Sequence, residues 1–282
     1  MQQRFMIAGA FLLAAILAAA FPAAADDAPE KKMVTVSGQE VEEIMPGILA
    51  GYLSEDERLD SKRFVPPAPA EGSARQALDD AWSEAMLKLK DSPRWEIATR
   101  DAAYFPGAAD TFSCALGIRI SEDTTPALYL LLWRSLSDIG LATYTAKNAY
   151  ARERPFMANG APVCTPEIQE GMRKDGSYPS GHTAYGWGWA LILTELAPDR
   201  AEELLARGRA YGESRNVCNV HWYSDVVAGR MVGAGAVARL HAEPEFVAAM
   251  DAAREEIAEA RKAGRTPTRD CALEASVLTP SP

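Results

Sequence analysis

The sequence predicts an all-α fold, in which a single helical-bundle domain follows an irregular N-terminal arm. From Ser73 onward, apolar residues recur three and four positions apart, which is the spacing of a helix face. Alternating apolar and polar runs are nearly absent, and residues 33–36 (MVTV) are the one short strand candidate. No internal repeat and no obvious linker follows residue 72. We therefore expect one domain over residues 73–264 and a tail over residues 265–282.

The first 25 residues have the composition of a segment that is separate from the fold. Arg4 lies in a short polar start, residues 5–20 are apolar, and Ala23-Ala24-Ala25 precedes two aspartates. This is the layout of a secretory signal peptide with an A-x-A cleavage site. An uncleaved membrane anchor is the alternative, but the apolar run is shorter than the ~20 residues that a membrane span needs. We therefore expect residues 1–25 to be removed on export.

The arm and the first helix come next. Residues 26–72 are irregular and end in the proline-rich stretch VPPAP at residues 65–69, which cannot be the interior of a helix. Ser73 is a favourable N-cap for a helix over ALDDAWSEAMLKLK, residues 77–90. Its apolar positions follow helical spacing and are Leu78, Trp82, Ala85, Met86 and Leu89.

Five further helices are predicted downstream. One begins at Pro126, with Thr124 or Thr125 as its cap and proline in its first turn, and it extends toward Arg154 with a break at Gly140. The other four are expected at residues 183–197, 200–214, 219–240 and 244–262.

Charge and hydropathy exclude two classes of partner. The chain has 29 Lys and Arg and 39 Asp and Glu, and loss of Arg4 with the leader leaves 28 against 39, a net charge of −11. A general basic surface for nucleic acid is not expected, so any anion must be met by a local basic cluster. No segment after the leader reaches about 18 uninterrupted apolar residues, so no stable membrane insertion is expected after cleavage.

Four cysteines remain after the leader: Cys114, Cys164, Cys218 and Cys271. An even number in an exported chain predicts disulfides, and three pairings are possible. No C-x-x-C spacing occurs, which disfavours a zinc or redox site.

Lys147 and Arg154 form the first candidate site segment. They are seven residues apart, so on one helix they would share a face at a separation of about 10 Å along the axis. Pro155 would place Arg154 at a helix end, because the residue before a proline is pushed out of helical geometry. Two such cations are, by themselves, more often a solvated stripe.

The second segment is GSYPSGHT, residues 176–183. Small residues before a helix leave backbone N–H groups accessible, and the helix dipole adds positive charge there, so Ser180 and Gly181 can bind a phosphate. Gly181 lets an oxygen approach the backbone closely, and His182 would stand beside the anion. The alternative is a proline turn with a serine cap and an incidental histidine.

The third segment, SRNVCNVHWYSD, contains His221 and Asp225 four residues apart. On a helix, Asp225 could accept a hydrogen bond from one ring nitrogen and leave the other as the lone pair that a nucleophile needs. Arg215 adds a two-pronged cation for phosphoryl oxygens. A local helix hydrogen bond, or part of a metal site, is the alternative.

Together the segments supply three cations, an anion-binding helix start, two histidines and one orienting carboxylate. The third histidine, His241, is expected near a helix end at the surface. This combination indicates a phosphoryl-transfer site that needs neither metal nor cofactor.

The same residues carry a resemblance to a known family. K-x6-RP (residues 147–155), PSGH (179–182) and S-R-x5-H-x3-D (214–225) together resemble the type 2 phosphatidic acid phosphatase superfamily, which includes vanadium-dependent haloperoxidases. The full GSYPSGHT is similar to the bacterial class A non-specific acid phosphatases. The resemblance spans roughly residues 64–240, and it leaves the tail after Gly264 unmatched.

The resemblance implies a role for each matched residue. His221 attacks phosphorus and becomes phosphohistidine, Asp225 orients it, and His182 protonates the leaving alcohol. The residues that hold the phosphoryl oxygens are Lys147, Arg154, Ser180, Gly181 and Arg215. It also implies small phosphomonoester substrates, a periplasmic location, and a homodimer or larger homo-oligomer. Since Cys164 and Cys218 flank motif segments, we favour their pairing, which leaves Cys114 for Cys271.

Other functions stay open at this point. Within the superfamily these are a phosphatase for lipid phosphates or diphosphates, a vanadate-dependent haloperoxidase, and phosphate transfer to alcohols. Outside it they are a non-catalytic oxyanion-binding protein and a metal-dependent phosphatase with His182, His221 and Asp225 as ligands. Because His182 must be protonated while His221 is neutral, we expect an acidic to near-neutral pH optimum.

Overall fold

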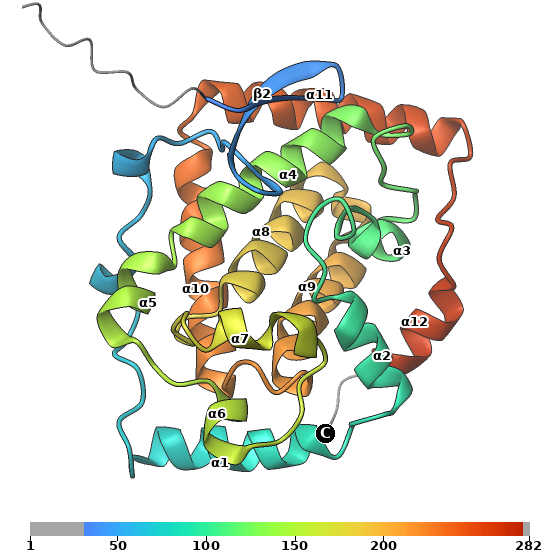
Figure 1. Cartoon of the computed structure of the whole chain (residues 1–282). Coiled ribbons are helices and arrows are strands. Elements are labelled where there is room, and N and C mark those ends of the chain that lie inside the picture. The colour runs from blue at the N-terminus through green and yellow to red at the C-terminus, as the bar shows by residue number, and fades with distance from the viewer. Residues whose placement is uncertain (1–30, 279–282) are drawn as a thin grey trace, which may run out of the picture. The chain divides into compact units, whose positions relative to one another are not determined.

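The computed structural model describes residues 31–278, and helices form most of them (Figure 1). The five longest are α4 (Pro126–Leu141), α8 (Gly181–Leu196), α9 (Ala201–Val217), α10 (Tyr223–Leu240) and α11 (Pro244–Lys262). The shorter ones are α1 (Ala74–Leu87), α2 (Pro93–Arg100), α3 (Ser113–Leu116), α5 (Tyr144–Tyr150), α6 (Pro155–Asn159), α7 (Gln169–Met172) and α12 (Cys271–Val277). Among residues 31–278, none of the helices has both the length and the apolarity to cross a membrane. The predicted leader, residues 1–25, lies outside the described residues.

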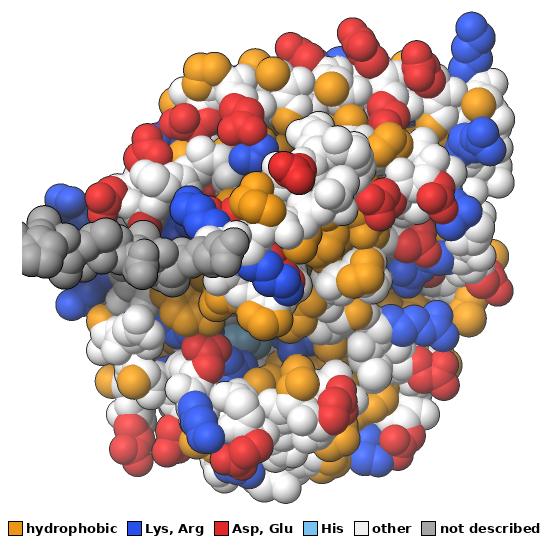
Figure 2. All heavy atoms as spheres, turned by 45° about the horizontal axis from the view of Figure 1, so that its top comes forward, with side chains coloured by type: hydrophobic (Ala, Val, Ile, Leu, Met, Phe, Trp, Pro, Cys, Tyr) orange, Lys and Arg blue, Asp and Glu red, His pale blue; other side chains and the backbone are white. Residues whose placement is uncertain are grey.

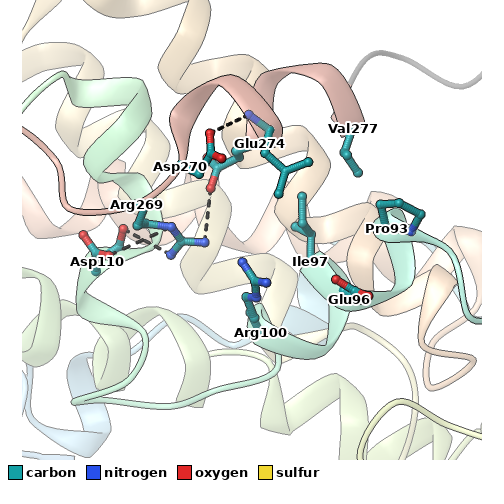
Figure 3. Close-up of a pocket in the computed structure, with 10 residues that line it drawn as sticks. Pro93, Glu96, Ile97, Arg100, Asp110, Arg269, Asp270, Glu274 and Val277 are labelled. Atoms are coloured by element: carbon teal, nitrogen blue, oxygen red, sulfur yellow. Dashed lines mark hydrogen bonds and ion pairs between the residues drawn. The ribbon is translucent and has the colours of Figure 1, made fainter.

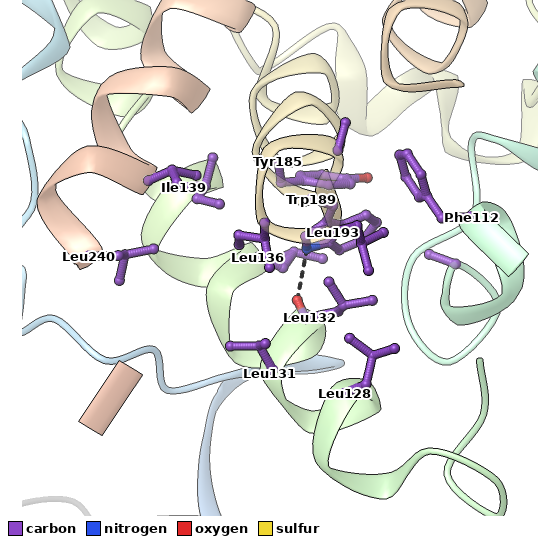
Figure 4. Packing of buried hydrophobic residues seen from close by; sticks show 14 of the residues in the cluster. Phe112, Leu128, Leu131, Leu132, Leu136, Ile139, Tyr185, Trp189, Leu193 and Leu240 are labelled. Atoms are coloured by element: carbon purple, nitrogen blue, oxygen red, sulfur yellow. Dashed lines mark hydrogen bonds between the residues drawn. The ribbon is translucent and has the colours of Figure 1, made fainter. Parts of the chain in front are cut away.

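Helix α8 occupies the centre of the bundle and contacts α4, α9, α10 and α11 (Figure 1). Because its side chains are apolar on nearly every face, the helix has to be surrounded by others. In Figure 4, Trp189 and Leu193 of α8 pack among Leu132 and Leu136 of α4. The indole N–H of Trp189 donates to the Leu132 carbonyl at 2.9 Å. The start of α8, which carries GSYPSGHT, is thereby anchored in a rigid core.

Two glycines bring α10 into backbone contact with α8. A Cβ added at Gly229 would lie 2.6 Å from the Ser180 carbonyl oxygen, and one at Gly233 would lie 2.3 Å from the Ala184 carbonyl oxygen. The two residues are one helical turn apart, so they form a continuous contact strip. The Ser180 N–H also donates to the Asp225 carbonyl at 3.0 Å. The beginnings of α8 and α10 therefore lie side by side.

The strand candidate at residues 33–36 is confirmed as a strand, but the expectation that the rest of the arm is irregular is wrong. The arm contains a three-stranded antiparallel sheet of β1 (Met33–Val36), β2 (Gln39–Met45) and β3 (Ile48–Leu49), in the order β1-β2-β3. Ser37 and Gly38, both with positive φ, make the two-residue hairpin turn between β1 and β2. The sequence did not reveal β2 because its apolar residues do not alternate.

The sheet is fixed to the helices by buried polar contacts. Asp138 of α4 accepts the backbone N–H groups of Tyr52 and Leu53 at 2.8 and 3.1 Å. The indole N–H of Trp133, also in α4, donates to the Gly47 carbonyl at 3.0 Å. The turn between β2 and β3 is thus held against α4.

Two disulfides join distant segments. Cys164 is bonded to Cys218 and Cys114 to Cys271, which is the pairing that the sequence favoured. The second bond attaches the tail, which forms α12, to α3. The tail is therefore part of the folded structure, and its Glu274 is buried.

Candidate active site

The three motif segments meet at one cavity of about 410 Å³. Six of the eight predicted site residues line it: Lys147, Arg154, Gly181, His182, Arg215 and His221. In Figure 2, a histidine and basic side chains lie at the base of a hollow that hydrophobic side chains surround. The other two predicted residues, Ser180 and Asp225, are fully buried behind the lining.

Lys147 and Arg154 do not share a helix, contrary to expectation. Helix α4 ends at Leu141, and α5, which carries Lys147, ends at Tyr150 because Ala151 takes a left-handed conformation with φ of 42°. Arg154 is the N-cap of the next helix, α6. A chain reversal, not helical periodicity, brings the two cations together.

Asp175, which the sequence analysis missed, pairs with both cations. Its carboxylate lies 3.2 Å from the Lys147 ammonium and 2.9 Å from a guanidinium nitrogen of Arg154. Lys147 also donates to the Gly176 carbonyl at 2.6 Å. Burial, followed by the charge of Arg154, lowers the pKa of Lys147 to about 8, while Asp175 opposes that change. Lys147 is therefore cationic in acid and near-neutral solution.

Arg215 supplies the strongest sign of an anion site. It lies in the last turn of α9, and the residue is only 2% exposed. Within residues 31–278, its Nε and Nη1 atoms are buried and have no hydrogen-bond partner. Since buried donors without acceptors are costly, these two unpaired nitrogens favour an anionic ligand in the cavity that Arg215 lines.

His221 lies outside the helix that was expected to hold it. Helix α10 begins at Tyr223 with Trp222 as its N-cap, so the expectation of His221 and Asp225 stacked on one helix face is wrong. Instead, the chain after α9 folds back, and the His221 N–H donates to the Arg215 carbonyl at 3.3 Å. This short reversal explains the six-residue spacing between Arg215 and His221.

The contacts of His221 assign its tautomer. Its Nε2 lies 3.1 Å from Nη1 of Arg154, and a guanidinium can only donate, so Nε2 is the acceptor. Nδ1 therefore carries the hydrogen, and it lies 3.4 Å from Oδ2 of Asp225. Burial, then the charges of Arg154, Lys147 and Arg215, hold the pKa of His221 well below its ordinary value. The ring is neutral, with the Nε2 lone pair beside the cations.

Asp225 belongs to a buried polar network that the sequence analysis did not find. Its Oδ2 accepts from the Ser177 hydroxyl and from the Trp222 N–H at 2.8 Å, and its Oδ1 accepts from Arg152 at 2.7 Å. Arg152 also pairs with Asp79 of α1 at 2.6 Å. Burial raises the pKa of Asp225, while Arg152 and these hydrogen bonds lower it. With Arg152 beside it, we treat Asp225 as the ionised partner of His221.

Of Asp79 and Arg152, the two charged residues of this network that were not predicted, only Asp79 could have been recognised from the sequence. Asp79 lies at helical spacing from Trp82 and Met86, on the face that α1 turns inward, and a charge there needs a buried partner. Arg152 falls at an unspecified position of K-x6-RP, and nothing in that pattern distinguishes it.

His182 is held by a backbone carbonyl and by aromatic rings. Its Nε2 lies 3.2 Å from the Ala102 carbonyl, so Nε2 carries a hydrogen and Nδ1 is the nitrogen that exchanges a proton. The rings of Tyr104 and Tyr185 pack on it at centroid distances of 4.6 and 5.0 Å. Burial, followed by the charge of Arg215, holds the pKa of His182 well below its ordinary value.

Ser180 is the N-cap of α8. Its hydroxyl oxygen accepts from the Thr183 N–H at 3.2 Å and from the Thr183 hydroxyl at 2.9 Å. These bonds shape the turn that exposes Gly181 to the cavity. That Ser180 also holds phosphate stays a prediction.

The tail supports the site from behind. Asp101 is buried and accepts from Arg207 at 3.1 Å and from the Ser214 hydroxyl at 2.6 Å, and Arg207 also pairs with Glu274 of α12 at 3.2 Å. Asp101 immediately precedes Ala102, whose carbonyl holds His182. The unmatched tail therefore contacts the layer that supports both His182 and the Arg215 turn.

A second cavity, of about 270 Å³, lies between α2 and α12 (Figure 3). Figure 3 shows Arg269 between Asp110 and Glu274, and its guanidinium lies 3.1 Å from the Glu274 carboxylate. Its described lining includes none of the predicted site residues. The chemistry predicted from the motifs belongs to the larger cavity alone.

Comparison with known families identifies the part of the chain that carries these residues. The model of the PAP2 superfamily matches residues 127–244, which include all eight predicted site residues. The helical bundle of this chain, which carries the cationic cavity with two histidines, is thus of the PAP2 type.

Curated relatives narrow the family. The chain is 42% identical over 209 residues to an acid phosphatase of Zymomonas mobilis, covering 72% of this chain and 78% of that protein. It is 42% identical to non-specific acid phosphatases of Providencia stuartii (75% of this chain, 86% of the relative) and Salmonella typhimurium (73% and 83%). The chain belongs to the non-specific acid phosphatase family of the PAP2 superfamily. This confirms the predicted family, all-α class and enzyme type.

Proposed function

We propose that the protein hydrolyses phosphomonoesters through a phosphohistidine on His221. The observation that carries the proposal is the 3.1 Å contact between Nε2 of His221 and the buried Arg154 guanidinium, from which we infer that Nε2 holds the lone pair. A neutral imidazole among fixed cations is suited to attack on a phosphoryl group whose negative charge those cations neutralise.

In the first step, Nε2 of His221 attacks phosphorus in line with the leaving oxygen. The N–P bond forms as the P–O bond to the alcohol breaks, and Nδ1 of His182 delivers a proton to the departing oxygen. The unpaired N–H groups of Arg215 donate hydrogen bonds to phosphoryl oxygens, and Lys147 and Arg154 bind the remaining phosphoryl oxygens. Asp225 stabilises the positive charge that develops on the His221 ring.

In the second step, His182, now neutral, takes a proton from water as the water attacks phosphorus. The N–P bond breaks, inorganic phosphate is released, and His221 returns to its neutral form. We propose phosphate transfer to alcohols as a second activity, because an alcohol can replace water in the second step with the same chemistry.

Trapping the intermediate tests this mechanism. The protein is mixed with ³²P-labelled phosphomonoester and quenched in alkaline denaturant, because phosphohistidine is labile in acid. Wild type should retain protein-bound label, and His221→Ala should retain none and lose turnover of p-nitrophenyl phosphate. Retained turnover in a folded His221→Ala variant contradicts the nucleophile assignment.

Binding measurements separate an enzyme from an oxyanion-binding protein. Inorganic phosphate should still raise the melting temperature of His221→Ala, because Arg215, Arg154 and Lys147 remain. A wild type that binds phosphate but turns over no ester would be a binding protein, which is the alternative that the sequence left open.

We also propose that the protein is exported to the periplasm after cleavage behind residue 25, and that it forms a homodimer or larger homo-oligomer. Two disulfides support an oxidising compartment. Cell fractionation with N-terminal sequencing of the mature chain tests export, and sedimentation equilibrium tests assembly.

A further inference from the structure

The catalytic cavity extends well beyond the phosphoryl group. Its volume of about 410 Å³ is in the ~300–1,000 Å³ range of sites that enclose a drug-sized ligand. The cations and histidines lie among a larger number of apolar and aromatic lining residues. Part of the cavity is therefore available for the alcohol portion of a substrate.

Large hydrophobic side chains gather at this part of the cavity. Met45, Tyr104, Tyr144 and Ile168 line it and are exposed by 45, 48, 42 and 40%. With Ile48, which also lines it, we call this set the apolar collar. The collar contains four of the eleven exposed large hydrophobic residues within residues 31–278. Clustering of this kind marks a binding surface, and here it adjoins the phosphoryl site.

The collar is assembled from segments far apart in sequence. Met45 ends β2 and Ile48 begins β3, so the two residues flank the β2–β3 turn, which Trp133 holds through its hydrogen bond to the Gly47 carbonyl. Phe105 stacks on Trp133 with ring centroids 5.2 Å apart and an interplanar angle of 11°. The turn is thus preformed, so binding a ligand there costs little ordering entropy.

We propose that the apolar collar binds the leaving group and selects phosphomonoesters whose alcohol carries a planar aromatic ring. The proposal rests on the phosphomonoester hydrolysis proposed above. The tyrosine rings of residues 104 and 144 provide faces and edges for an aromatic ring, and the Met45 thioether makes favourable contacts with one. A polyol leaving group would instead bury hydroxyls against Met45, Ile48 and Ile168, which offer no hydrogen bonds.

The β2–β3 turn is accordingly a specificity element. Met45 and Ile48 line the cavity but have no side-chain group that can donate a hydrogen bond to a phosphoryl oxygen, so we expect them to act on the alcohol portion. Their loss should raise KM for aromatic esters while the phosphoryl cradle stays unchanged.

The test compares two substrates in two variants. Phenyl phosphate and glycerol 2-phosphate are assayed with wild type, Met45→Ser and Met45→Ser/Ile48→Ser. The kcat/KM for phenyl phosphate is divided by that for glycerol 2-phosphate, and this ratio is compared between the proteins. The comparison cancels the difference in chemical reactivity between the two esters. We expect that ratio to fall about 10-fold in the double variant, mainly through KM. One methylene in an enclosed apolar pocket discriminates ~10–200-fold, and the low end applies because the Met45 side chain is partly exposed. The inhibition constant of inorganic phosphate should stay within about twofold.

Met33→Ser is the matched control. Met33 lies in β1 of the same sheet, is 50% exposed, and is outside the cavity lining, so its substitution should leave the ratio unchanged. The single Met45→Ser variant changes only an exposed side chain and is expected to fold. It therefore still tests the proposal if the double variant does not fold.

The outcomes are distinct. An unchanged ratio in a folded Met45→Ser/Ile48→Ser variant, or an equal fall in Met33→Ser, overturns the collar proposal and leaves phosphomonoester hydrolysis intact. A wild type that hydrolyses neither ester overturns the proposed function itself.

Discussion

The two cavity histidines are the same residue type in opposite surroundings. His221 is fixed by charged groups, with Arg154 at one nitrogen and Asp225 at the other. His182 is fixed by the Ala102 carbonyl and by tyrosine rings. In the proposed mechanism, this difference matches two requirements: the nucleophile, His221, needs one defined lone pair, and the general acid, His182, needs a proton that it releases readily.

The surroundings meet these requirements through different physical effects. In the proposed mechanism, the Arg152–Asp225 network orients His221 and stabilises the charge that it gains on attack, independently of the leaving alcohol. The apolar, cation-facing pocket of His182 lowers the pKa of that ring, so its protonated form is a stronger acid. Substitutions on the two sides should therefore respond differently to the leaving group.

The largest effect is expected for Asp225→Asn. The amide can donate to Nδ1 of His221 and favour the other tautomer, which turns an N–H toward phosphorus and removes the lone pair. By analogy with other oriented histidines, kcat should fall by ~10²- to 10⁴-fold. The fall should be similar for esters of good and poor leaving groups, measured over a series of aryl phosphates. A steep dependence on leaving-group pKa would assign Asp225 to proton transfer instead.

A smaller and leaving-group-dependent effect is expected for His182→Ala. Loss of the general acid should cost ~10²-fold or more with alkyl phosphates, whose alkoxides leave poorly. With 2,4-dinitrophenyl phosphate, which needs no protonation, the first step should fall less than about 10-fold in a single-turnover burst, since general-acid catalysis contributes little to good leaving groups. Equal losses across the series would remove the distinction between the two histidines.

The histidines themselves could be identified from sequence because each lies in a short contiguous motif. GSYPSGHT predicted a helix start, which lies two residues earlier in α8 than the expected residue 183. The Arg215-to-Asp225 stretch indicated a candidate nucleophile and its carboxylate, and these two roles stay predictions. Fold class followed from helical periodicity, and the helices expected at 183–197 and 244–262 lie within two residues of α8 and α11.

What supports the histidines could not be predicted, because it depends on contacts between distant segments. Asp79 reaches Arg152 from α1, and Glu274 reaches Arg207 from a tail that matched no motif. Local geometry also differed from the prediction. The helix that the apolar pattern extended toward Arg154 ends before Ala151, which has a positive φ. The hairpin at Ser37 and Gly38 was missed because apolar and polar residues do not alternate in β2. Motifs specify reacting groups, whereas tertiary packing decides how they are held.

The smallest predicted effect concerns the pKa values of the two rings. Lys147 is among the charges that lower the pKa of His221, whereas Arg215, His221 and Arg154 act on His182. Lys147→Met should therefore raise the pKa of His221, because a protonated ring then meets one cation fewer, and leave that of His182 nearly unchanged. Ring ¹⁵N chemical shifts followed against pH without phosphate, with His182→Gln to assign the signals, measure both. Equal upward shifts would mean that the rings share one electrostatic environment, and the separation of nucleophile from acid would then have to arise from hydrogen bonding alone.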